Sequence, residues 1–250
     1  MVDTSASVVA DLPETLILWD VDHTLIENGG VSKATYALAF ELLTGHAPSV
    51  RPATDGRTDF VIMHELLSAN SVGTEKYVEI GQFEDALAEA MERNVSQLSQ
   101  RGHILPGVIE ALAMLSAMPT VVQSVLTGNI TSNARAKLGV FGLDRWVDLD
   151  VGGFGSDDTI RSNLVDAARR KVLKKYGMPF DRSSTILIGD TLLDIKAARD
   201  GGAKIIAVAT GVYSTSQLTE AGADVTLDSL VDLDRFMAAL VELRAGVMLA

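Results

Sequence analysis

Cysteine is absent from the 250-residue sequence, which excludes disulfide bonds, thiolate catalysis and cysteine-based metal sites. The four histidines are scattered without an HxxxH or HxH pairing, and this disfavours a zinc site. No run of about 18 apolar residues occurs, so we expect no membrane-spanning helix. The N-terminal MVDTSASVVADLPE lacks the basic and apolar regions of a signal peptide and reads as a short lead-in. A cytoplasmic location is therefore the default expectation.

Basic residues are scarce, with 21 Lys and Arg against 33 Asp and Glu and a formal net charge of −12. This balance argues against nonspecific binding to nucleic acid or to an anionic membrane, because both need a basic face. The negative net charge is still compatible with a small anionic substrate that is bound by a local positive site. The length allows one large domain, or one domain with an insertion.

Several short apolar runs are typical of buried strands. They lie at 16–21, 120–127, 147–153, 184–191 and 203–210, with a weaker one at 224–230. From residue 104 onward they alternate with helical patterns at 106–118, 132–142, 161–177 and 192–202. This alternation predicts an α/β fold, a Rossmann-like parallel sheet with helices on both faces.

The region between the first two predicted strands breaks the alternation. Its patterns at 33–45, 60–71 and 77–102 predict helices with no strand between them. A helical block of this size is too large for an ordinary crossover. We therefore expect a helical domain at 29–103, inserted into a core formed by 1–28 and 104–250. Its hinges are expected near Glu27–Gly30 and Gly102–Pro106.

Polar residues gather at the ends of the predicted strands, where open parallel sheets bind ligands. They are Asp20, Asp22 and Thr24 after the first strand, Thr127, Gly128 and Asn129 at the second, and Asp190 and Asp194 at the fourth. Clustered carboxylates are costly unless a cation lies among them. Magnesium prefers oxygen ligands of this kind, so we expect a Mg2+ site at this edge. The repulsion between Asp20 and Asp22 is tolerable if Asp20 binds the metal and Asp22 points away.

Three of these segments resemble motifs of the haloacid dehalogenase superfamily of aspartate-nucleophile phosphohydrolases. DVDHT (20–24) matches its DxDxT motif, SVLTGN (124–129) resembles the second motif, and IGDTLLDI (188–195) resembles GDxxxD. Their order, and their positions at predicted strand ends, fit the family. The helical insertion resembles its C1 cap. The resemblance points to the phosphoglycolate-phosphatase-like branch and covers nearly the whole chain from about residue 15.

The resemblance implies that Asp20 attacks phosphorus and forms an aspartyl-phosphate. It implies that Asp22 is a general acid toward the leaving alcohol, then a base toward the hydrolytic water. Asp22 would also lend its backbone carbonyl to magnesium. Asp190 would bind magnesium directly with Asp20, and Asp194 would bind the metal's waters or orient the site.

The second motif implies a phosphate-binding turn. Thr127 Oγ1 and the Gly128 backbone N–H would hold phosphate oxygens, with Asn129 beside them and the next helix N-terminus behind. The protein implied by the whole resemblance is a magnesium-dependent phosphatase. Its partner would be a small phosphorylated metabolite, and it would act as a monomer or homodimer.

The third motif departs from the family pattern, which usually has a lysine upstream of the fourth motif. We assign this role to Arg161, the first basic residue after the loop GGFGSDDTI (152–160). Lys171, a few turns into the predicted helix, is the alternative. Within the insertion, Arg57 of DGRTDF (55–60) is either a substrate contact or a loop arginine paired with a neighbouring acid.

Other activities of the same superfamily differ in which motif carboxylates they retain. A phosphomutase of the β-phosphoglucomutase type retains both aspartates of the first motif and stays open as an alternative. Dehalogenases and phosphonatases resemble the chain in fold but lack the second aspartate, so Asp22 argues against both. A regulator without catalysis would be expected to lose a motif carboxylate, and none is lost here.

Overall fold

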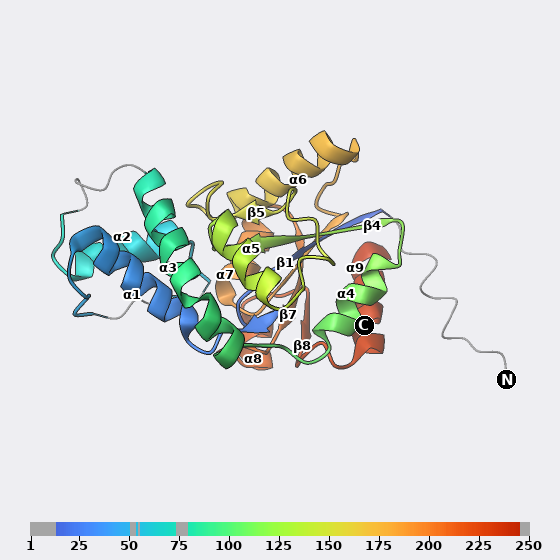
Figure 1. Ribbon diagram of the computed structural model, residues 1–250. Helices are drawn as coiled ribbons and strands as arrows, with labels where there is room; N and C mark the ends of the chain where they lie inside the picture. Colours follow the sequence, from blue (N-terminus) through green and yellow to red (C-terminus); the bar gives the residue numbers. More distant parts are fainter. Residues whose placement is uncertain (1–13, 51–53, 55, 74–79, 246–250) are drawn as a thin grey trace.

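The computed structural model describes residues 14–50, 54, 56–73 and 80–245. Its centre is a six-stranded sheet in the order β5-β4-β1-β6-β7-β8, in which each neighbouring pair is parallel. The strands are β1 (Thr15–Trp19), β4 (Val121–Thr127), β5 (Gly153–Phe154), β6 (Thr185–Gly189), β7 (Lys204–Val208) and β8 (Val225–Leu227). The predicted α/β class is therefore confirmed (Figure 1).

Both faces of the sheet are covered by helices, because alternate residues of each strand point to opposite sides. Ile17 and Trp19 of β1 join one apolar cluster, whereas Leu16 and Leu18 join the other. The first cluster is completed by α4 (Val108–Ser116), α5 (Thr131–Val140) and α9 (Leu233–Ala245). The second is completed by α6 (Asn163–Tyr176), α7 (Leu192–Asp200) and α8 (Thr215–Glu220).

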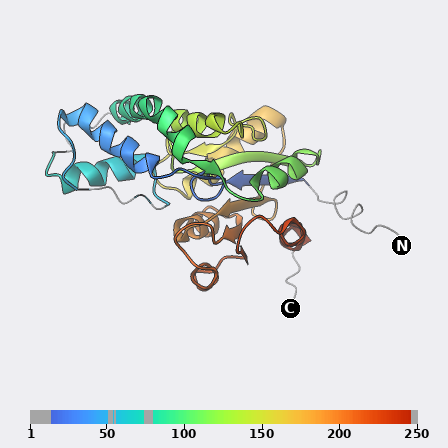
Figure 2. The same cartoon turned by 60° about the horizontal axis from the view of Figure 1, so that its bottom comes forward.

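Three helices lie between β2 (Ile26–Glu27) and β3 (His103–Ile104) in the chain and pack on one another. They are α1 (Val31–Thr44), α2 (Asp59–Ala69) and α3 (Ile80–Arg101), called here the helical insertion. They enclose an apolar cluster of their own that includes Phe40, Met63 and Leu87. Figures 1 and 2 show the three helices together at one side of the sheet.

A two-stranded antiparallel ribbon of β2 (Ile26–Glu27) and β3 (His103–Ile104) connects the insertion to the sheet. It lies at the positions where the sequence predicts hinges, although these short strands were not predicted. Gly29 beside the ribbon has a φ of 60°. A Cβ on Gly29 would lie 2.5 Å from the Arg101 carbonyl oxygen, so the two connecting segments approach too closely for a larger residue.

The strand predicted at 147–153 is wrong, because β5 contains only Gly153 and Phe154. The Asp148 carboxylate accepts a hydrogen bond from the Asp150 backbone N–H at 3.0 Å. The Asp148 backbone N–H bonds to the Gln123 carbonyl of β4 at 2.8 Å, but the chain then turns and pairs with β4 again only at Gly153. Helices α8 and α9 were not predicted. The predicted lead-in at 1–13 and the first residues of the predicted helix 77–102 lie outside the described residues.

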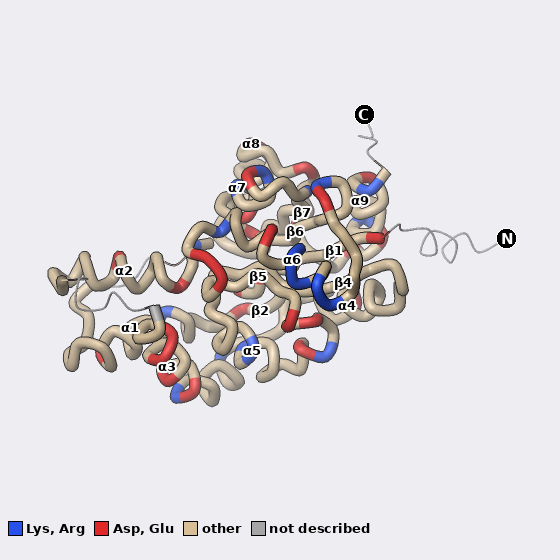
Figure 3. Tube along the Cα trace, turned by 90° about the horizontal axis from the view of Figure 1, so that it is seen from above, with Lys and Arg blue, Asp and Glu red and all other residues tan. Residues whose placement is uncertain are grey.

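Charged side chains are distributed unevenly over the core. Figure 3 shows lysines and arginines gathered along α6. Three of them are paired with acids, Arg169 with Asp166 at 3.5 Å, Lys171 with Asp157 at 2.6 Å and Lys175 with Asp148 at 2.7 Å. Among the helices of the described residues, none is both long enough and apolar enough to cross a bilayer.

Candidate active site

The carboxyl ends of β1, β4 and β6 meet at one edge of the sheet, because β1 lies between the other two. Asp20, Thr127 and Asp190 stand at or directly after these ends and line one cavity of about 50 Å³. This volume holds a few water molecules. Side chains of the helical insertion, among them Tyr36 and Arg57, line the same cavity. The cavity is therefore small and enclosed by both parts of the chain.

Three carboxylates come together below the cavity. One oxygen from each of Asp20, Asp190 and Asp194 lies within 4.8 Å of the others, and all three residues are buried. Burial, together with the charges of Asp194 and Asp22, raises the pKa of Asp20 to about 7 although Arg161 opposes the shift. Burial and the same kind of repulsion raise the pKa of Asp190 well above its ordinary value. Buried oxygen ligands that repel one another in this way fit a hard divalent cation.

The backbone leaves room for this cluster at Gly211. A Cβ on this glycine would overlap the Asp190 Oδ2 atom. Thr24 Oγ1 donates to the other Asp190 oxygen at 3.2 Å. Asp190 is therefore fixed by its neighbours in the position where it joins the acidic cluster.

Arg161 reaches this cluster from the turn before α6. Its Nη2 donates to Asp20 Oδ1 at 2.8 Å and to Asp194 Oδ1 at 2.6 Å. Its Nη1 donates to the Gly56 carbonyl of the insertion at 3.2 Å. Burial alone would lower its pKa, but the two carboxylates outweigh burial and raise the pKa, so the guanidinium stays charged.

Lys171, the alternative third-motif residue, lies elsewhere. Its Nζ donates to the Gly152 carbonyl at 2.7 Å and to Asp157 Oδ2 at 2.6 Å. It is absent from the described residues that line the cavity. Of the two candidates, the structure brings Arg161 to Asp20.

Asp194 is oriented by the N-terminus of α7. Thr191 and Asp194 form a capping box, in which the Thr191 N–H donates to Asp194 Oδ2 at 3.0 Å and the Asp194 N–H donates to Thr191 Oγ1 at 3.2 Å. The other oxygen, Oδ1, faces Arg161. Asp194 thus caps α7 with one carboxylate oxygen and belongs to the acidic cluster with the other.

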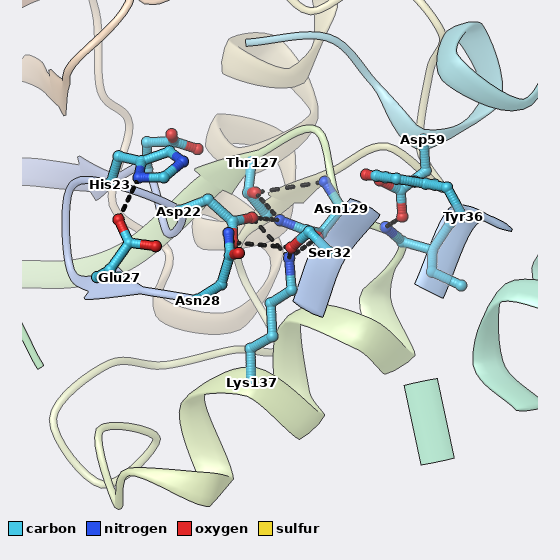
Figure 4. A network of polar contacts seen from close by, with 12 residues as sticks. Asp22, His23, Glu27, Asn28, Ser32, Tyr36, Asp59, Thr127, Asn129 and Lys137 are labelled. Atoms are coloured by element: carbon cyan, nitrogen blue, oxygen red, sulfur yellow. Dashed lines mark hydrogen bonds and ion pairs between the residues drawn. The ribbon is translucent and has the colours of Figure 1, made fainter. Parts of the chain in front are cut away.

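Asp22 points away from the acidic cluster into a set of four donors (Figure 4). Oδ1 accepts from Asn28 Nδ2 at 2.8 Å and from Ser32 Oγ at 3.2 Å. Oδ2 accepts from Asn129 Nδ2 at 2.9 Å and from Lys137 Nζ at 2.6 Å. Burial would raise the pKa of Asp22, but Lys137 and the amide donors outweigh burial and hold the pKa below its ordinary range.

The predicted phosphate-binding turn lies across the cavity. Thr127, Gly128 and Asn129 all line it. Thr127 Oγ1 accepts from Asn129 Nδ2 at 2.7 Å, which fixes the hydroxyl (Figure 4). Helix α5 begins at Thr131, so the turn leads into a helix N-terminus. A hydroxyl and backbone N–H groups placed in this way suit an anion.

The N-terminus of α2 docks on this turn. The Asp59 N–H donates to the Gly128 carbonyl at 2.8 Å, and the Ile130 N–H donates to Asp59 Oδ2 at 2.8 Å. Tyr36 donates from its hydroxyl to Asp59 Oδ1 at 2.6 Å. Burial raises the pKa of Asp59 to about 6. These bonds hold the insertion against the core.

Arg57 also lines the cavity from the insertion. Its Nη1 lies 2.8 Å from Glu65 Oε2, and its side chain is 36% exposed. Arg57 is therefore paired with an acid, as the second sequence interpretation has it, and its contact with a substrate stays a prediction.

Sequence reasoning missed five polar residues of the site, which are Asn28, Ser32, Tyr36, Asp59 and Lys137. One signal was available for Lys137. Asn129, Asn133 and Lys137 follow one another at intervals of four, which places polar side chains on one face of a helix. Asn133 and Lys137 are both buried, so this face of α5 is a polar part of the interior.

The sequence is similar to those of proteins named as phosphatases, and the fold is shared with solved structures. A family model described as haloacid dehalogenase-like hydrolase matches residues 17–199. A probable phosphatase, IndB, from Dickeya dadantii is 28% identical over 145 residues, a match that spans 58% of this chain and 60% of that protein. The pyrophosphatase PpaX from Halalkalibacterium halodurans is 23% identical over 217 residues, 87% of this chain and 94% of that protein.

A solved structure shows the same fold. It is a predicted phosphoglycolate phosphatase from Haemophilus somnus, with a TM-score of 0.63 and 16% identity. The match covers 90% of this chain and 98% of that one, so it includes the helical insertion as well as the sheet.

Proposed function

Because the chain belongs to the haloacid dehalogenase-like hydrolase family, we propose that it is a magnesium-dependent phosphatase. It hydrolyses a small phosphate monoester through an aspartyl-phosphate on Asp20. One observation carries this proposal: Asp20 belongs to the acidic cluster, accepts a hydrogen bond from Arg161, and shares a cavity with the Thr127 turn. A nucleophile, a fixed cation and an anion-binding turn thus face one small space.

The first half of the reaction transfers the phosphoryl group to the protein. A carboxylate oxygen of Asp20 attacks phosphorus, and the bond from phosphorus to the ester oxygen breaks. The leaving oxygen takes a proton from Asp22. Lys137 and the amide donors favour the ionised form of Asp22 in the empty site, so Asp22 must bind this proton when the anionic phosphate lies beside it and raises its pKa. The Thr127 hydroxyl and the backbone of the turn hold the phosphoryl oxygens, and Arg161 offsets negative charge beside Asp20.

The second half releases phosphate. Asp22, now a carboxylate, takes a proton from a water molecule, and the resulting hydroxide attacks the phosphorus of the aspartyl-phosphate. This returns Asp20 as a carboxylate and frees inorganic phosphate. Asp20, Asp190 and Asp194 would hold magnesium, directly or through its waters, and the metal would supply neutralising charge to the phosphoryl group.

The substrate is a small soluble molecule. The helical insertion acts as a cap, since it docks on the phosphate-binding turn and encloses a cavity of about 50 Å³. A phosphorylated protein would not fit beneath it. The names of the relatives, a probable phosphatase and a pyrophosphatase, support a phosphate substrate.

The experiment is a screen for released phosphate over a panel of metabolite monoesters, with pyrophosphate included, with and without Mg2+. We expect Mg2+-dependent release from at least one small monoester. Failure on the whole panel in Mg2+ would contradict the proposal. Transfer of phosphate to a sugar acceptor, instead of its release to water, would favour a phosphomutase.

A further inference from the structure

Lys137 is a buried lysine that the reaction above does not use. Its side chain is 1% exposed, and it lies in the last turn of α5. Its ammonium donates to Asp22 Oδ2 at 2.6 Å, to Asn129 Oδ1 at 2.7 Å and to Ser32 Oγ at 2.8 Å. An ammonium carries three N–H donors, so these acceptors use all of them.

The three acceptors come from three parts of the chain, as Figure 4 shows. Asp22 follows β1, Asn129 follows β4, and Ser32 lies in the first turn of α1 in the insertion. Asn129 and Ser32 also donate to Asp22 themselves. Lys137 therefore binds Asp22 directly and also fixes two of the other groups that hold it.

The position of Asp22 requires such a partner. Asp20 and Asp22 are two residues apart, and a carboxylate free to rotate there could turn toward the acidic cluster or its cation. Lys137 attracts the carboxylate to the opposite side. A buried charge is costly unless it is paired and hydrogen-bonded, and this arrangement satisfies the lysine and the aspartate together.

We propose that Lys137 is a positioning residue for Asp22. It holds the Asp22 carboxylate turned away from Asp20 and beside the cavity, where proton transfer to and from the substrate takes place. This inference rests on the proposed function, because it assigns Lys137 to the proposed acid and base of that reaction.

A structural ion pair would give the same contacts, so the test must separate the two roles. Loss of a purely structural lysine lowers the fraction of active protein and reduces kcat/KM equally for every substrate. Loss of a residue that positions the general acid harms most the substrates that need a proton on their leaving group. The comparison is kcat/KM for para-nitrophenyl phosphate against the alkyl phosphate that the protein hydrolyses fastest, because kcat/KM reports the first half of the reaction.

Lys137→Met removes the charge and the donors with little change in volume. We expect kcat/KM for the alkyl phosphate to fall at least about tenfold more than kcat/KM for para-nitrophenyl phosphate, within the range of general acid catalysis. Lys171→Met is the matched control, since Lys171 also lies on a core helix and pairs with an aspartate at 2.6 Å. It should leave both values unchanged. An equal fall for the two esters after Lys137→Met, or no fall, overturns the proposal.

Two further variants complete the experiment. Should Lys137→Met fail to fold, Lys137→Gln keeps a hydrogen-bonding side chain and is judged by the same comparison. In an Asp22→Asn background, adding Lys137→Met should change kcat/KM less than about twofold, because residues that act as a unit are not additive. An independent, multiplicative loss in the double variant also overturns the proposal.

Failure of the inference is distinguishable from failure of the proposed function. If Asp22→Asn slows the alkyl ester selectively and the Lys137 variants do not, only the role of Lys137 is wrong. If Asp22→Asn shows no such selectivity, the acid role of Asp22 in the proposed function is wrong, and the positioning role fails with it.

Discussion

Arg161 Nη2 lies 2.8 Å from the Asp20 carboxylate, although 141 positions separate the two residues in the chain. Each side chain is only 9% exposed. Water therefore screens this ion pair weakly, and the guanidinium is fixed beside the atom that we expect to attack phosphorus. It offsets the repulsion between an anionic nucleophile and an anionic substrate.

We predict that Arg161→Ala lowers kcat/KM by on the order of 10²–10³-fold, as for other electrostatic stabilisers. Arg161→Lys should recover part of the loss, because it keeps the positive charge. Steady-state kinetics on the best substrate of the panel measure both. Lys171→Ala is the control and should be nearly silent. Normal activity of Arg161→Ala together with loss in Lys171→Ala would show that the third motif is misplaced.

Asp22→Asn should slow both halves of the reaction, since asparagine neither donates nor accepts the transferred proton. General acid–base catalysis typically contributes about 10²–10⁴-fold. Para-nitrophenyl phosphate should be affected less in the first half-reaction, because its leaving group needs little protonation. Rapid-quench measurement of single-turnover phosphorylation tests this. Equal losses for good and poor leaving groups would contradict the acid role.

Magnesium dependence should vary with pH in a defined direction. The pKa of Asp20 is about 7 without metal, against 3.8 for an ordinary aspartate. Below pH 7 the metal must displace a proton from this carboxyl group. We predict that the Mg2+ concentration for half-maximal activity rises by up to about tenfold for each pH unit below 7. Activity should vanish in excess EDTA, and full turnover there would rule out the metal.

The raised pKa of Asp20 also predicts how the stability of the fold depends on pH. A carboxyl group whose pKa is higher in the folded state binds more protons there, so metal-free stability falls as pH rises from about 4 to 7. Mg2+ binds the ionised form and should raise Tm more at pH 8 than at pH 5. Thermal unfolding with Mg2+ and with EDTA measures the difference. A larger effect of Mg2+ at the lower pH would contradict the shift of Asp20.

Gly128 allows the helical insertion to approach the phosphate-binding turn. A Cβ on Gly128 would overlap the Arg57 carbonyl oxygen and crowd Thr58. We predict that Gly128→Ala lowers kcat/KM by on the order of 10²-fold, because small misplacements at a reaction centre have effects of this size. Steady-state kinetics measure the loss.

Gly139→Ala is the matched control for this change. Gly139 lies within α5, and a Cβ there would meet no atom within 4 Å. Because Gly139 is the last residue but one of α5, alanine there should change the stability by less than the value of about 0.5–1 kcal/mol for a mid-helix position, and it should leave activity unchanged. If Gly128→Ala were equally harmless, the close docking of the insertion would not matter for catalysis.

The sheet edge was predictable because its residues follow a simple rule. Asp20, Thr127 and Asp190 each lie at the carboxyl end of an apolar run, and parallel strands bring such ends together. The positions of these residues at strand ends therefore predicted that their side chains would lie close together. The turn near Asp148 was not predictable in this way, because a side-chain hydrogen bond overrides the apolar pattern there.

The contacts of the insertion could not be read from the sequence, because they depend on how two folded parts pack. Asp59 meets Ile130 across 71 positions, and neither residue belongs to a strand end. A lysine in a helix is usually exposed, so the sequence gives no reason to place Lys137 in the interior. Its partners Asp22 and Ser32 come from other elements of the fold. Such partners appear only when the tertiary structure is known.

The central claim is that Asp20 carries the phosphoryl group, and trapping of that intermediate tests it most directly. The protein is mixed with its best substrate and Mg2+, quenched in acid within a turnover, and its peptides are weighed by mass spectrometry. We predict one added phosphoryl group on the peptide that contains Asp20, lost on longer incubation and absent from Asp20→Asn, which should also be inactive. A phosphoryl group on another residue, or turnover by Asp20→Asn, would contradict the account.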